Sequence, residues 1–138
     1  MTTVTALDKE KPSLRIPLLL RIVSILILIE GMLGMLLFVS AGIFQLNDPN
    51  FIGSIGLNGF SSNFYSFYIV LHIIIFTGLL ISGFFLLKLK KIAYYLFISN
   101  YLVLSLITIY TNEVFGWSTI IIGLVFLAIL TYFRKSMI

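Results

Sequence analysis

A single acidic side chain, Glu30, lies inside an apolar stretch long enough to cross a membrane, RIVSILILIEGMLGMLLF. Arg21 opens this stretch, and no other ionisable residue follows Glu30 until Asp48. A charged side chain at the centre of a membrane helix costs about 2.5–3.5 kcal/mol on insertion scales. An acid in that position therefore binds a proton, pairs with a cation or faces water. Glu30 is the residue whose type and position could do chemistry within the membrane.

Two polar residues in other apolar stretches are candidate partners of Glu30. Glu30 lies nine residues after Arg21, and Asn100 lies nine residues after Lys91. At a rise of 1.5 Å per residue, both polar groups lie about 13 Å from their basic ends, so we expect them at a similar depth. His72 is predicted closer to the opposite end, where a direct pair with Glu30 needs helix tilt or a bridging water. As a single histidine it favours a packing role over a proton relay.

Three roles are possible for Glu30. A protonated Glu30 would donate a hydrogen bond to Asn100 or to a backbone carbonyl and hold two helices together. Alternatively, Glu30 would be a proton or cation site in a carrier. The third possibility is a contact with another subunit or with a bound ligand. Tyr94, Tyr101, Ser105 and Thr108 add a polar and aromatic stripe to the stretch that contains Asn100.

Small residues indicate where the helices would touch. In lipid no hydrophobic force drives helices together, and close packing at small side chains does much of that work. Gly34, one turn after Glu30, predicts the close approach of another helix backbone to the acid. Gly78 with Ser82, and Thr119 with Gly123, have the four-residue spacing that places both members of a pair on one helix face. The residues expected at helix contacts are Gly31, Gly34, Gly78, Ser82, Thr119 and Gly123.

Composition identifies the elements that must position these residues. Of the 138 residues, 60% are hydrophobic and only 10% are charged, whereas soluble domains have about 25% charged residues. We therefore predict an all-α membrane protein, an antiparallel bundle of four transmembrane helices in one domain over residues 15–138. The predicted spans are about 18–44, 66–87, 92–110 and 117–133. Residues 1–14 are predicted to be a flexible cytoplasmic tail. The apolar loop 45–65 should lie along the outer interface or cap the bundle.

The positions of the basic residues predict the orientation. All nine Lys and Arg lie near the N-terminus, in the 88–91 turn or near the C-terminus. Positive residues favour the cytoplasmic side, so both termini should be cytoplasmic. Each basic cluster flanks an apolar span, which argues against a nucleic-acid partner and for a multi-pass protein of the cell membrane. A prokaryotic plasma membrane is the expected location.

Several kinds of chemistry are not expected. The chain has no Cys and one His, so disulfides, thiolate metal sites and thiol redox chemistry are excluded. No cluster of nucleophile, base or metal ligands stands out. We therefore expect no catalytic site, no metal, no cofactor and no enzymatic activity.

Two resemblances accompany these patterns. The segment ILILIEGMLGML resembles the first helix of the small multidrug resistance exporters, in which a membrane-embedded acid exchanges protons for cationic drugs. The segments LRIPLLLRIVSILILIEGMLGMLLF and GLLISGFFLLKLKKIAYYLFI, with a last span ending in YFRK, are similar to small uncharacterised prokaryotic four-helix membrane proteins. The second resemblance covers most of the chain and implies architecture without implying a particular chemistry.

Two functions follow as hypotheses. The first is an accessory or structural subunit of a membrane complex, with the lipid bilayer and other membrane subunits or further copies of the chain as its partners. The second is a small proton-coupled carrier or exporter that uses Glu30.

Overall fold

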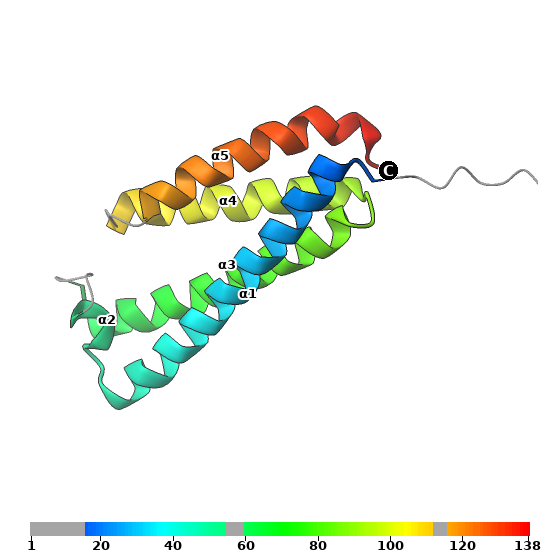
Figure 1. Cartoon of the computed structure of the whole chain (residues 1–138). Helices are drawn as coiled ribbons and strands as arrows, with labels where there is room; N and C mark the ends of the chain where they lie inside the picture. The colour runs from blue at the N-terminus through cyan, green and yellow to red at the C-terminus, as the bar shows by residue number, and fades with distance from the viewer. Residues whose placement is uncertain (1–15, 55–59, 112–115) are drawn as a thin grey trace, which may run out of the picture.

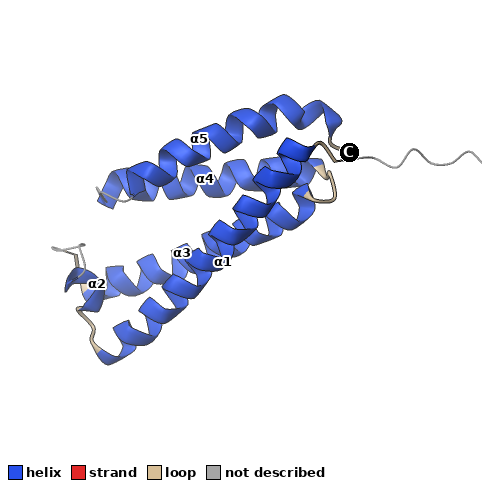
Figure 2. Ribbon diagram, viewed as in Figure 1, coloured by secondary structure: helices blue, strands red, loops and turns tan. Residues whose placement is uncertain are grey.

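The computed structural model describes residues 16–54, 60–111 and 116–138, and this part of the chain is helical with no strand (Figures 1 and 2). The tail predicted over residues 1–14 lies outside the described residues. The helices are α1 (Leu18–Asn47), α2 (Phe51–Ser54), α3 (Ser62–Leu86), α4 (Lys91–Thr111), α5 (Gly116–Phe133) and the short 3₁₀ helix η1 (Arg134–Ser136).

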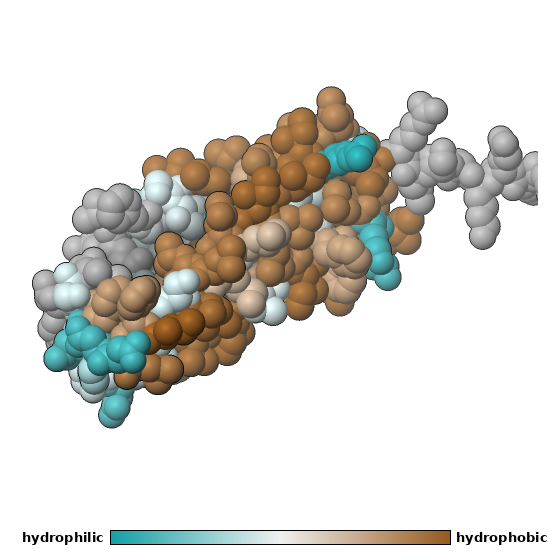
Figure 3. All heavy atoms as spheres, turned by 60° about the horizontal axis from the view of Figure 1, so that its bottom comes forward, coloured by the Kyte–Doolittle hydropathy of each residue, from teal (hydrophilic) through white to brown (hydrophobic). Residues whose placement is uncertain are grey.

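Four helical segments are long and apolar enough to cross a membrane: α1, α3, α4 and α5 continued by η1. The predicted all-α fold with four apolar helices is thereby confirmed, and the four helices indicate a membrane protein. The start of α1 lies beside the C-terminus, at the end opposite α2 (Figure 1). A broad apolar band separates hydrophilic residues at the two ends on the face shown in Figure 3. We call the end that holds Arg21, Lys88, Lys90, Lys91, Arg134 and Lys135 the basic end, and the other the α2 end.

The connection between α1 and α3 is shorter than the loop predicted over residues 45–65. The helix α1 continues through Asn47, and α3 already begins at Ser62. Side-chain hydrogen bonds explain both boundaries. Ser61 accepts a hydrogen bond from the backbone N–H of Phe64 and caps α3. The amide of Gln45 donates to the carbonyl of Pro49 and accepts from the N–H of Ile52 at 3.1 Å, which turns the chain back onto α1.

The helix α2 packs across the ends of α1 and α3 that lie opposite the basic end. Its Ile52 is buried in a cluster with Ala41 of α1 and with Tyr65, Tyr68 and Ile69 of α3. This part of the connection therefore caps the α1–α3 pair. Capping was one of the two arrangements expected for the loop from the sequence. Residues 55–59 lie outside the described residues.

The helices α1 and α3 approach closely through reciprocal pairs of glycine and leucine. A Cβ atom on Gly31 of α1 would lie 2.9 Å from Leu80 Cγ of α3. A Cβ atom on Gly83 of α3 would lie 2.8 Å from Leu28 Cγ of α1. Real Cβ atoms do not come so close, so each glycine makes room for the leucine opposite.

The helices α3 and α4 form a hairpin that meets at the predicted pair Gly78 and Ser82. Ser82 is fully buried and its hydroxyl donates to the carbonyl of Ala93 at 2.9 Å. A side chain at Gly78 would overlap the amide of Asn100. Both residues therefore lie on the face of α3 that contacts α4.

The helices α4 and α5 pack at a seven-residue interval. The ring of Tyr101 occupies the space beside Gly123, and Thr108 occupies the space beside Gly116. The hydroxyl of Tyr101 also donates to the carbonyl of Ile120. These contacts place α5 against α4, whereas α5 touches α1 only slightly. Figure 1 shows the α1–α3 pair and the α4–α5 pair diverging toward the α2 end.

Candidate functional site

A groove of about 560 Å³ lies between α1 and α5, with α3 and α4 contributing the remaining walls. Its walls are mostly Leu, Ile and Phe side chains. The polar side chains that line it are Glu30, His72, Thr108 and Thr119. A mostly apolar cavity of this size with few polar groups is typical of small-molecule sites.

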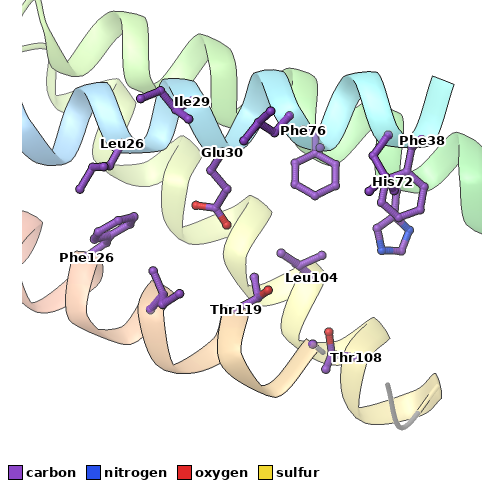
Figure 4. A pocket seen from close by; sticks show the side chains of 15 residues that line it. Leu26, Ile29, Glu30, Phe38, His72, Phe76, Leu104, Thr108, Thr119 and Phe126 are labelled. Atoms are coloured by element: carbon purple, nitrogen blue, oxygen red, sulfur yellow. The ribbon is translucent and has the colours of Figure 1, made fainter. Parts of the chain in front are cut away.

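The Glu30 carboxylate points from α1 toward α4 and α5 (Figure 4). It also borders a second, narrow cavity of about 10 Å³ that Tyr101, Thr119 and Gly123 help to line. Among the described residues, none forms a hydrogen bond or ion pair with Glu30. The acid is thus placed in a half-buried, apolar setting with its oxygen atoms directed into the groove.

Asn100, the first predicted partner, does not meet Glu30. Its amide packs against Gly78 of α3 and donates to the carbonyl of Leu96 at 2.8 Å. The residues of α4 that line the cavities beside Glu30 include Phe97, Tyr101 and Leu104, so the depth predicted for the acid matches this level of α4. The prediction that Asn100 lies on the face of α4 beside Glu30 was wrong, because Asn100 lies on the face that contacts α3.

His72 lines the same groove closer to the α2 end. It is buried, with 3% of its surface exposed, and its Nδ1 lies 2.8 Å from the carbonyl oxygen of Tyr68. A carbonyl only accepts, so Nδ1 carries the proton in this contact. The ring stacks on Phe38 at 4.3 Å between centroids, and the ring of Phe76 lies between His72 and Glu30 in Figure 4. The contacts suit the predicted packing role.

Gly34 has a different neighbour from the one predicted. The ring of Phe76 from α3 fills the space that a side chain at Gly34 would need. The expected approach of a helix backbone is therefore wrong: the small residue admits an aromatic side chain. That ring forms part of the groove wall beside Glu30.

Thr119 has a role beyond the predicted helix contact. Gly123 packs against α4 as expected, whereas Thr119, one turn earlier on α5, lines both the groove and the narrow cavity with Glu30. The seven-residue spacing of Tyr94, Tyr101 and Thr108 was the sequence signal for this side of α4. All three residues are buried and turn toward α5.

The arrangement can bind positive charge. In surroundings of low dielectric, an isolated carboxylate is stable with a bound proton or with a bound cation. Thr119 and Thr108 add hydroxyl groups on the opposite wall. The apolar walls favour a ligand whose remaining surface is also apolar.

No protein family, curated protein or solved structure was found to match this chain.

Proposed function

We propose that this multi-pass membrane protein is a small carrier that binds a lipophilic cation at Glu30 in exchange for a proton. The observation that carries the proposal is the position of the carboxylate in an apolar groove, where no described residue neutralises it. A proton and an organic cation compete for the same oxygen atoms. Binding of one therefore releases the other.

The shape of the groove suits entry from the bilayer. From Leu26 to Phe38 the groove follows α1 for roughly 18 Å. Leu33 and Leu37 of α1 and Ile122 of α5 line it, and 62%, 61% and 47% of their surfaces are exposed. A groove open along exposed apolar side chains is accessible to a ligand already dissolved in lipid.

Binding of tetraphenylphosphonium, a lipophilic monocation, tests the proposal. With the purified full chain in detergent, calorimetric titration should show affinity that rises as pH is raised, because protons then compete less for Glu30. Glu30→Gln should lower the affinity by at least about tenfold, equivalent to about 1.4 kcal/mol. The amide keeps the hydrogen bonds of a neutral acid, so we expect the helical fold and insertion to remain intact.

Asp48→Asn is the matched control, because Asp48 is exposed beyond the end of α1 and is absent from the groove lining. It removes the same charge and should leave binding unchanged. In liposomes, a pH gradient should drive uptake of the cation by the wild type and not by Glu30→Gln. Absence of binding at every pH would overturn the carrier proposal. Equal binding by Glu30→Gln and Asp48→Asn would do the same.

An accessory subunit is the second candidate, and the length of the same groove favours it. A groove that follows α1 for roughly 18 Å offers a seat for one face of a partner's transmembrane helix. Protonated Glu30 would then donate a hydrogen bond to that helix. Cross-linking from a photoreactive residue at position 33 in native membranes tests this role: a defined partner supports it, and labelling of lipid alone contradicts it.

A further inference from the structure

A further cavity, of about 430 Å³, lies at the basic end and shares no lining residue with the Glu30 groove. It is lined by Lys91 and Tyr95 of α4, Thr131 of α5, and Arg134 and Lys135 of η1. Three of these five side chains are cationic and the other two carry hydroxyl groups. The cavity therefore presents hydrogen-bond donors and positive charge together.

The return of the chain after α5 assembles this cavity. The backbone N–H of Ile138 donates to the carbonyl of Leu89 at 2.7 Å, and the N–H of Lys91 donates to the backbone oxygen of Ile138 at 2.9 Å. Met137 is buried in the core, with 3% of its surface exposed. These contacts hold η1 against the start of α4 and bring Arg134 and Lys135 to Lys91.

Arg134 is held in position by two tyrosines of α4. Its Nη2 donates to the hydroxyl of Tyr95 at 2.8 Å. Its guanidinium carbon lies 5.4 Å from the centroid of the Tyr94 ring and 5.5 Å from that of Tyr95. An arginine has five N–H donors in a planar fork that matches phosphate oxygens. Fixing the group in advance reduces the entropy that an anion's binding would cost.

No acidic side chain among the described residues lines this cavity. The acids within 16–54, 60–111 and 116–138 are Glu30, in the middle of α1, and Asp48, at the α2 end. The 21 residues of α4 span about 31 Å, close to the thickness of the hydrocarbon core. Lys91, the first residue of α4, therefore lies at the level of the lipid headgroups.

We propose that this cavity binds the phosphate group of an anionic lipid headgroup. Arg134 supplies paired N–H donors, Lys91 and Lys135 supply charge, and the Tyr95 hydroxyl supplies a further polar contact. A free phosphate offers the same oxygen atoms, but a lipid phosphate is delivered at this depth by the bilayer itself. The acyl chains of the lipid would lie along the apolar band of the helices.

Lipid retention by the full-length protein tests this site. The wild type, reconstituted in nanodiscs with phosphatidylglycerol and phosphatidylcholine and then released into detergent, should keep phosphatidylglycerol in native mass spectra. The double variant Arg134→Gln with Lys135→Gln should weaken this retention by about tenfold or more. Lys135→Gln alone, at an exposed side chain, gives a smaller loss and serves if the double variant does not fold.

The matched control is Lys88→Gln with Lys90→Gln. These lysines lie at the same end, over the rings of Phe84 and Phe85, and do not line the cavity. The control should keep phosphatidylglycerol as the wild type does. Equal losses in both double variants would overturn the site in favour of general surface charge. Displacement of the lipid by millimolar inorganic phosphate would overturn the assignment to a lipid headgroup, and equal retention of phosphatidylcholine would do the same.

Discussion

The two sides of α1 differ in how tightly they pack against the neighbouring helices. Toward α3, Gly31 makes room for Leu80 and Gly83 makes room for Leu28, so the two helices touch along their crossing. Toward α5, α1 presents Glu30 and exposed leucines, and a groove of about 560 Å³ remains between the helices.

The small residues explain this difference. Thr108 of α4 fills the space beside Gly116 of α5, and Tyr101 of α4 fills the space beside Gly123. Both glycines of α5 thus pack against α4, whereas Thr119 of α5 lines the groove on the side of α1. A helix pair closes where a small residue meets a large one, and a groove is left where no such pair exists.

The largest expected effect of a substitution is on the closed α4–α5 contact. Gly123→Leu should lower the thermal unfolding midpoint strongly, because the new side chain and the ring of Tyr101 cannot share one space. Overpacking of this kind costs about 1–3 kcal/mol, and sometimes more. Circular dichroism during heating in detergent measures the effect.

Ala128→Leu is the matched control, since Ala128 is exposed on the same helix. It should leave the unfolding midpoint close to that of the wild type. If both variants unfold alike, the α4–α5 contact is not tightly packed, and the contrast with the groove disappears.

An intermediate effect is expected on ligand binding when the open side is filled. Ile122→Trp places an indole in the groove and should weaken tetraphenylphosphonium binding by about tenfold. The unfolding midpoint should stay unchanged, because the groove has room for the ring. Calorimetric titration and thermal unfolding of the same preparation give both quantities.

Val125→Trp provides the comparison, because Val125 is exposed on α5 and does not line the groove. Binding by this variant should match that of the wild type. A large loss of stability in Ile122→Trp would show that the α1–α5 side is closed in solution.

The smallest effect concerns one hydrogen bond on the closed side. Ser82→Ala removes the bond to the carbonyl of Ala93 and should lower the free energy of unfolding by about 0.6 kcal/mol, the average for such bonds in membranes. Ser99→Ala, at an exposed residue that bonds within its own helix, should have no effect. Unfolding by titration with sodium dodecyl sulfate measures the free energy of unfolding of both variants. Equal free energies would show that the Ser82 hydrogen bond does not stabilise the α3–α4 contact.

Some features of the site followed from the sequence and others did not. The level of Glu30 beside α4 was predicted from the count of residues after each basic end. The pairing with Asn100 was not, because Asn100 and Tyr101 are neighbours in sequence yet point about 100° apart around the helix. Gly78, on α3, decided which of them faces Glu30 by admitting the amide of Asn100.

The sequence by itself determined the four apolar helices, their basic ends and the isolation of a single acid within them. These properties depend on composition and on position along a helix, and the rise per residue converts position into depth. Only the tertiary structure decided that Glu30 faces a groove beside α5 and that Arg134 meets Lys91 at the C-terminal return. Those outcomes depend on rotation of each helix about its axis, which is set by the fit of small and large side chains on neighbouring helices.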